Sequence, residues 1–262
     1  MSAASEAVGI EAGREERFEY VLRLADTSLI AGQRLAALLG HDPALEEDLA
    51  LGNIALDLIG QARLLLALAA RIEARGRDED ALAFLRDAPE FRNVSLVEQP
   101  NGDFAQTIVR QCLLDAWQVE MYESLAGSRD LQLADIAEKA LKECRYHWRF
   151  SAGWLVRLGD GTAESQARVR AALASLWRFT DELLSPDALD ARMAVCGIGP
   201  APALIRERWQ SRLRVTLAEA GLDWPAHQHY RWHGKRGEHT EHLGHLLAEM
   251  QFLPRAYPGA TW

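Results

Sequence analysis

The residues whose types and spacing most clearly suggest chemistry are Cys144 and His147, within Lys-Glu-Cys-Arg-Tyr-His at residues 142–147. Helical bundles that bind two iron ions carry Glu-x-x-His on each of two helices, because a spacing of three keeps the carboxylate and the imidazole on one face. Here the histidine is present, but a cysteine stands at the position of the carboxylate. The motif therefore indicates a descendant or partner of an iron oxygenase and disfavours the oxygenase itself.

The long apolar stretches of the chain also carry polar residues on the faces that their periodicity predicts to be buried. A buried carboxylate without a partner costs several kcal/mol, so such groups must be hydrogen-bonded, ion-paired or bound to metal. The predicted polar core consists of Asp26, Asp57, Asp115, Glu143 and His147.

Two interpretations of this core remain open. In the first it contains no metal, and His147 pairs with a carboxylate, helped by Gln61 or by an arginine such as Arg63 or Arg145. In the second the same five residues bind metal. A di-iron site usually takes four carboxylates and two histidines in spaced pairs, whereas the stretch around Asp57 contains no histidine. We therefore favour the metal-free core.

A second group of metal-ligand residue types lies near the C-terminus. Glu238, His242, His245 and Glu249 would share one face of a helix. One helix cannot enclose an ion, and the His-Glu-x-x-His pattern of zinc proteases does not occur there. We interpret the strip as a polar face that packs against a neighbouring chain or against its own bundle.

The loop 232–237 precedes this strip and contains Lys235 and Arg236. A basic loop before a helix start can hold a phosphate through backbone amides and the lysine. Such a contact stays a hypothesis, because the loop lacks a fuller glycine-rich motif.

Composition limits the class of protein. The chain has 262 residues, of which 48% are hydrophobic, so it can bury a large core without disulfides or metals. Its formal net charge of −9 argues against general binding to nucleic acid or to an anionic membrane. The three cysteines show no paired spacing, and no signal peptide or membrane-spanning run is evident, so we expect a reduced cytoplasmic protein.

Apolar residues recur at helical spacing along most of the chain, with hardly a strand signal. Asp42-Pro43 supplies a capping side chain and a first-turn proline for the second long helix. Two pairs of long helices joined by a long crossover predict an all-α, ferritin-like four-helix bundle with additional C-terminal helices. We expect a disordered tail over residues 1–14 and a single domain over residues 15–262. The predicted segments are long helices at 15–39, 43–75, 103–126 and 131–158, a crossover at 88–102, and shorter helices at 80–85, 163–184, 186–195, 201–220 and 238–256.

Four stretches carry a resemblance to a known family. They cover residues 22–26, 43–63, 98–110 and 234–259, the last of which reads Gly-Lys-Arg-Gly-Glu-His-Thr-Glu-His at its start. From about residue 18 to the C-terminus the chain resembles the C subunits of bacterial phenylacetyl-CoA oxygenases, which are ring 1,2-epoxidases. The resemblance implies a ferritin-like fold.

This resemblance also implies partners and cofactors. In that family a paralogous A subunit holds the di-iron centre and inserts one oxygen atom into the aromatic ring, and the C subunit supports it structurally. A small B subunit assists assembly, and a reductase with flavin and an iron–sulfur cluster delivers electrons from NADPH. The ligand positions of the A subunit fall on Leu58, Gln61, Cys144 and His147, three of which depart from the metal-binding pattern.

We therefore expect a non-catalytic subunit with no catalytic residues, metal or cofactor of its own. The alternative is a self-sufficient di-iron oxygenase or oxidase that uses the five residues of the polar core. A third hypothesis is that Lys235 and Arg236 touch the phosphates of coenzyme A held mainly by the A subunit.

Overall fold

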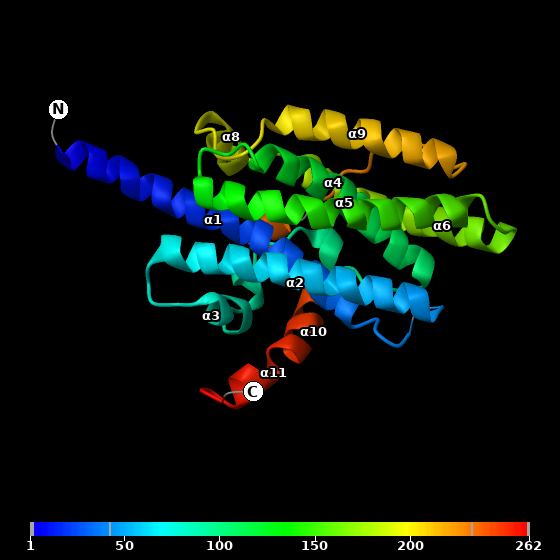
Figure 1. The fold of residues 1–262 in the computed structure, drawn as a ribbon, viewed down its shortest axis with the longest axis horizontal. Coiled ribbons are helices and arrows are strands. Elements are labelled where there is room, and N and C mark those ends of the chain that lie inside the picture. The colour runs from blue at the N-terminus through cyan, green and yellow to red at the C-terminus, as the bar shows by residue number, and fades with distance from the viewer. Residues whose placement is uncertain (1–2, 42, 232, 261–262) are drawn as a thin grey trace.

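The computed structural model describes residues 3–41, 43–231 and 233–260, with side chains from residue 13 onward. Four long helices form its body (Figure 1). α1 packs along α2, α4 packs along α5, and α2 also contacts α5. The predicted all-α, ferritin-like bundle is therefore confirmed for the described residues. The long helices are α1 (Ala3–Ala36), α2 (Leu45–Glu73), α4 (Phe104–Leu125) and α5 (Leu131–Gly159).

The predicted additional helices follow the bundle. α6 and α9 pack against α4, and α8 contacts α1. α10 and α11 project from the body of the molecule (Figure 1). The shorter elements are α3 (Glu79–Phe84), η1 (Ala88–Glu90), η2 (Ser95–Glu98), α6 (Ala163–Leu176), η3 (Trp177–Phe179), α7 (Thr180–Leu184), α8 (Ala188–Val195), α9 (Pro202–Glu219), η4 (Gly234–Arg236), α10 (Glu241–Met250) and α11 (Phe252–Ala256).

Side-chain caps explain where several helices begin. Asp103 accepts from the backbone N–H of Gln106 at the start of α4, and Asp130 accepts from that of Leu133 at the start of α5. Such acceptors satisfy backbone donors that have no partner within the helix. The start predicted for α2 differs, because its N-cap is Ala44, which has no capping side chain. Asp42 lies outside the described residues, and three acidic residues in the first turn favour this helix end instead.

The N-terminal segment is helical from Ala3 onward. Arg14 donates from Nε to the carbonyl of Ile72 and from Nη2 to that of Glu73, both at 2.6 Å, which ties α1 to the end of α2. The disordered tail predicted for residues 1–14 stays a prediction, since residues 1 and 2 and the side chains of residues 3–12 are not described.

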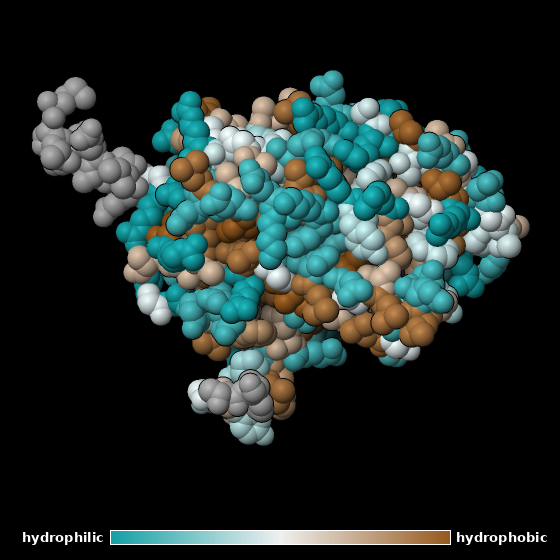
Figure 2. All heavy atoms as spheres, viewed as in Figure 1, coloured by the Kyte–Doolittle hydropathy of each residue, from teal (hydrophilic) through white to brown (hydrophobic). Residues whose placement is uncertain are grey.

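α2 is apolar on two faces. Its inner face is buried against the bundle, whereas Leu45, Leu49 and Leu56 are 69%, 58% and 68% exposed. Apolar residues gather on the surface over this helix (Figure 2). Among the described residues α2 is the one helix whose length and composition would suffice to cross a membrane, and half of its apolar stretch is buried within the bundle.

Residues 93–99 of the crossover between the helix pairs are buried, and this part of the chain ties the C-terminal segment to the bundle. The carboxylate of Glu98, in η2, is fully buried. It contacts His239 Nδ1 at 2.5 Å and accepts from the amide and hydroxyl of Thr240 at 2.8 and 2.7 Å. Arg34 of α1 donates to the carbonyls of both Glu98 and His242. These contacts hold the segment that leads into α10 against α1 and the crossover.

Two glycines of α5 differ in how closely neighbouring atoms pack against them. A Cβ at Gly159 would lie 2.3 Å from the carbonyl oxygen of Ala220, whereas one at Gly153 would have nothing within 4 Å. We expect Gly159→Ala to lower the free energy of unfolding by about 1–3 kcal/mol through overpacking. Gly153→Ala should raise it by about 0.5–1 kcal/mol, because alanine is the better helix former. Urea unfolding of both variants checks this, and changes of the same sign would contradict the close packing.

Candidate functional site

The centre of the bundle, between α2 and α5, is occupied by Gln61. Its side-chain Nε2 donates to Glu143 Oε2 at 2.9 Å and lies 3.8 Å from Cys144 Sγ. Leu58, one turn before Gln61 on α2, is fully buried and belongs to the apolar core. Two positions predicted as former ligand positions of α2 therefore hold an apolar side chain and an amide that bridges to α5.

His147 pairs with Asp57 across the same helices. Its Nε2 lies 3.1 Å from Asp57 Oδ2, with the imidazole fully buried and the carboxylate side chain 37% exposed. Burial lowers the pKa of His147, and the neighbouring Asp57 offsets this only in part. The imidazole is therefore neutral near pH 7 and donates from Nε2, while its buried Nδ1 has no hydrogen-bond partner among the described residues.

The arginines considered as partners of this core lie elsewhere. Arg63 Nε lies 3.6 Å from Glu79 Oε1, and Arg145 Nη2 lies 3.0 Å from Glu123 Oε1. Both ion pairs are near the surface. Neither arginine is positioned by these contacts to neutralise a buried carboxylate. The interior of the bundle at this point is held by the amide of Gln61 and by the pair of His147 with Asp57.

Asp115 of α4 is a fully buried carboxyl group. Ser151 Oγ donates to its Oδ2 at 2.7 Å, and Gln111 Nε2 lies 3.5 Å from its Oδ1. Burial raises the pKa of Asp115 to about 8, against the opposing effect of the Ser151 hydrogen bond. Burial also raises the pKa of the Cys144 thiol well above its ordinary value, with Asp115 adding to the effect. Asp115 is therefore largely protonated at pH 7, and burial keeps Cys144 in its thiol form.

Asp26 belongs to a different network, which corrects the sequence prediction that it joins this core. It forms a buried ion pair with Arg86, whose Nη1 donates to Oδ2 at 2.9 Å, and it accepts from the backbone N–H of Arg92 at 2.8 Å. The guanidinium of Arg86 also donates to the carbonyl of Glu90 and lies 4.2 Å from the ring centre of Phe91. Asp26 thus faces the segment between α3 and η2, which supplies both the cation Arg86 and the backbone N–H of Arg92.

The side chains present do not fit a di-iron centre. Within the described part of the chain, no group of three or more His, Cys, Asp and Glu residues is placed to hold a metal ion. Asp26 is bound by Arg86, Asp115 by Ser151, and Glu143 by Gln61. The metal-binding alternative needs these carboxylates to converge, and the geometry directs them to separate partners.

The C-terminal strip lies along α10 and the residues before it. Glu238, His245 and Glu249 are exposed, and His242 is half-buried. The face therefore points mainly to solvent in this chain.

Lys235 is engaged inside the molecule. Its Nζ lies 3.1 Å from Asp190 Oδ2 and 3.0 Å from the carbonyl oxygen of Ser185, and its side chain is only 12% exposed. Its backbone N–H donates to the buried carboxylate of Glu182 at 3.0 Å. Arg236 is exposed. The hypothesis that both residues bind a phosphate is therefore not supported for Lys235.

The buried charged groups that hold the crossover in place were not predicted from the sequence. Arg86 and Glu98 are fully buried, as is Arg110, which donates to the carbonyl of Gln99 at 2.8 Å and to Asn101 Oδ1 at 2.7 Å. Burial lowers the pKa of Arg110 to about 9. The sequence of residues 88–102 held only a weak indication of this burial, because its polar residues are interspersed with apolar ones.

The raised pKa of Asp115 predicts a pH dependence of stability. Its carboxyl group binds a proton in the folded state up to about pH 8 but releases it near 3.8 when unfolded. The contribution of Asp115 to the free energy of unfolding is therefore fully present below about pH 4 and is lost as the pH rises toward 8. Asp115→Asn keeps an acceptor for Ser151 and stays neutral, so its stability relative to the parent should increase by up to about 1.4 kcal/mol per pH unit over this range. Urea unfolding at pH 5, 6, 7 and 8 measures the difference, and parallel profiles would contradict the assignment.

The chain is similar to known proteins over nearly its whole length. The family model described as phenylacetic acid catabolic protein matches residues 1–262. The chain is also similar to a protein of Escherichia coli (strain K12) that is named as the C subunit of 1,2-phenylacetyl-CoA epoxidase. The two are 52% identical over 243 residues, which cover 93% of this chain and 98% of that relative. The resemblance inferred from the sequence motifs is confirmed, and the chain belongs to the phenylacetic acid catabolic protein family.

Proposed function

We propose that this chain is a non-catalytic subunit of a phenylacetyl-CoA 1,2-epoxidase, where it stabilises the catalytic di-iron A subunit. The name of its relative supports membership of such an enzyme. The observation that carries the non-catalytic role is the position of Gln61, which joins Glu143 to α2 where a metal-binding chain needs a ligand. The proposed setting is the cytoplasm, with a small B subunit and an NADPH-dependent flavin and iron–sulfur reductase as further components.

The contacts inside the bundle support a scaffold role. The ion pair of Asp26 with Arg86 and the hydrogen bond of Ser151 to Asp115 satisfy buried carboxyl groups without an added ion. Breaking such a buried pair by removing one partner costs about 3–5 kcal/mol. The core can therefore keep four helices in place by side-chain contacts alone, which is what a supporting subunit requires.

The exposed leucines of α2 are the proposed contact with the A subunit. Leu45, Leu49 and Leu56 share one face of the helix, and Leu64 lies at its edge. A Cβ at Gly60, on the same face, would meet no atom within 4 Å, so the surface is open there. A contiguous exposed apolar surface on a folded chain marks an interaction site. A helix of the A subunit would cover it, since the relative is itself named as one subunit of an epoxidase.

Metal content tests the non-catalytic role. We expect the chain purified alone to hold no stoichiometric iron, and a co-expressed complex to hold its iron in the A subunit. His147→Ala in this chain should leave the iron content and turnover of the complex unchanged and lower only the stability of this subunit, because His147 pairs with Asp57. Metal analysis of the separated chains measures this. About two irons per isolated chain, or loss of iron in the His147→Ala complex, would overturn the proposal.

The α2 surface is tested by charge substitution. Leu49→Glu combined with Leu56→Glu should weaken co-purification with the A subunit by about tenfold or more, because two carboxylates would be buried in an apolar contact. Both side chains are exposed, so thermal unfolding of the isolated chain should change little. Val215→Glu is the matched control, since Val215 is 59% exposed on α9, at the opposite edge of the bundle (Figure 1). Equal binding by the double variant and the control would exclude this face.

A further inference from the structure

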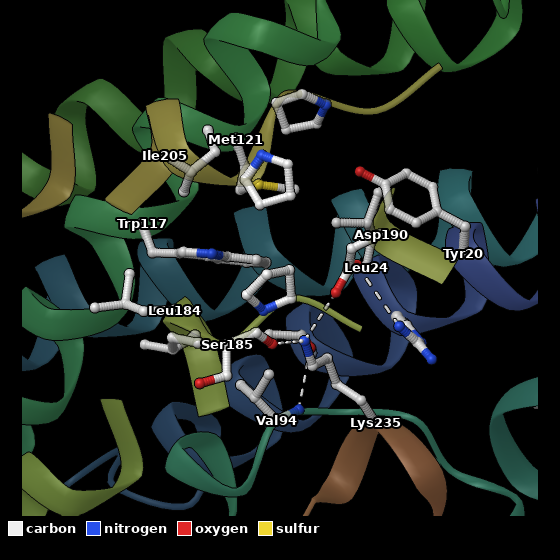
Figure 3. A pocket seen from close by; sticks show the side chains of 16 residues that line it. Tyr20, Leu24, Val94, Trp117, Met121, Leu184, Ser185, Asp190, Ile205 and Lys235 are labelled. Atoms are coloured by element: carbon white, nitrogen blue, oxygen red, sulfur yellow. Dashed lines mark hydrogen bonds and ion pairs between the residues drawn. The ribbon is translucent and has the colours of Figure 1, made fainter. Parts of the chain in front are cut away.

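A cavity of about 60 Å³ lies outside the polar core, where α1, α4, α8, α9 and the segment around Lys235 meet (Figure 3). Trp117 and Met121 of α4 and Ile205 of α9 form one wall, and Figure 3 shows them opposite Tyr20 and Asp190. Pro186, which also lines the cavity, is exposed and lies at its mouth. The cavity thus has an apolar side that a small organic group could contact.

The other side of the cavity carries matched charges. Arg23 donates to both carboxylate oxygens of Asp187, at 3.1 and 2.8 Å, and its Nη1 lies 3.6 Å from Asp190. Lys235 Nζ lies 3.1 Å from Asp190. Two cations therefore face two carboxylates. An additional anion would be buried here without a countercharge, which is costly.

Hydrogen-bond donors remain at this site after the internal contacts are made. Tyr20 is 3% exposed, lines the cavity, and its hydroxyl has no hydrogen-bond partner within the described part of the chain. In Figure 3 the hydroxyl points from α1 toward the cavity. Buried Arg23 Nε also has no partner there, and the ammonium of Lys235 has three N–H groups for the two acceptors given above. Buried polar groups are almost always hydrogen-bonded, so this excess of donors suits an acceptor oxygen.

We propose that this cavity binds a small neutral carbonyl compound, such as a short-chain amide. Its carbonyl oxygen would accept from the Tyr20 hydroxyl and the Lys235 ammonium, and its alkyl part would lie against Trp117, Met121 and Ile205. The ligand must be smaller than benzene, because benzene occupies a cavity of roughly 150 Å³ and this cavity has about 60 Å³. Neutrality follows from the matched charges of Arg23, Lys235 and the two aspartates.

Such a ligand would contact segments that are distant in the sequence. Tyr20 is in α1, Trp117 in α4, Ile205 in α9 and Lys235 in the segment before α10. A ligand that binds only when these segments are assembled stabilises the folded state by RT ln(1 + [L]/Kd), where [L] is the free ligand concentration. Binding at this site would therefore stiffen the junction between the bundle and the C-terminal segment. The proposal is independent of the role of the polar core.

Propionamide and propionate are the probes for the test, because they have almost the same shape and differ in charge. We expect propionamide to bind the full-length chain saturably in calorimetry, to raise its thermal unfolding temperature, and to occupy the cavity in soaked crystals. Propionate should do none of these at the same concentration. Tyr20→Phe should weaken propionamide binding about tenfold, because it removes the hydroxyl donor and keeps the ring. Tyr230→Phe is the matched control, since Tyr230 is 6% exposed and does not line the cavity.

Ile205→Phe is a second variant, which tests the site even if Tyr20→Phe does not fold. It should fill the apolar side and abolish binding. Equal binding of propionate and propionamide, ordered water alone in the soaked crystals, or unchanged affinity in Tyr20→Phe would each overturn the proposal. Absence of saturable binding in solution would overturn it as well.

Discussion

The cost of burying a carboxyl group inside an apolar bundle governs most of this structure. Asp26 meets that cost with the guanidinium of Arg86, and Glu98 meets it with His239 and Thr240. Asp115 meets it in a third way, because burial raises its pKa and keeps it protonated beside Ser151. Each solution requires a partner from another segment: the residues that follow α3 for Asp26, the residues before α10 for Glu98, and α5 for Asp115. The buried polar groups therefore determine how the crossover and the C-terminal segment lie against the four long helices.

The same constraint applies at the centre of the bundle. In a di-iron bundle the metals neutralise inward-facing carboxylates, and loss of the metals would leave those carboxylates unpaired. Here Leu58 and Cys144 bring no charge into the interior, and Gln61 is neutral and can both donate and accept. Glu143 and Asp57 stay nearer the surface, where water can solvate them. The side chains around Gln61 are thus mutually consistent, since Leu58, Gln61 and Cys144 carry no charged group and the carboxylates of Glu143 and Asp57 lie nearer the surface.

Local patterns in the sequence were sufficient to predict the helices, but they did not predict the partners of the buried charges. The caps Asp103 and Asp130 lie next to the residues they serve, so the starts of α4 and α5 could be read directly. The inward direction of Asp26, Asp115 and His147 also followed from helical periodicity, and all three are fully buried. That Asp26 meets Arg86 could not be inferred, because the pairing depends on how an irregular crossover folds back over α1. The same holds for Glu98 and His239, which are 141 residues apart.

In the proposed function, α2 would link the stability of this chain to its assembly. An apolar face of a helix is normally buried, yet one of the two apolar faces of α2 carries exposed leucines that contribute little to the fold of the isolated chain. Its other face includes Leu58 and Gln61, which close the centre of the bundle. Covering the outer leucines would hold α2 from both sides, and the contact of Gln61 with Glu143 would pass that constraint to α5. In the proposed complex this chain would therefore gain rigidity from its partner through the same helix by which it supports that partner.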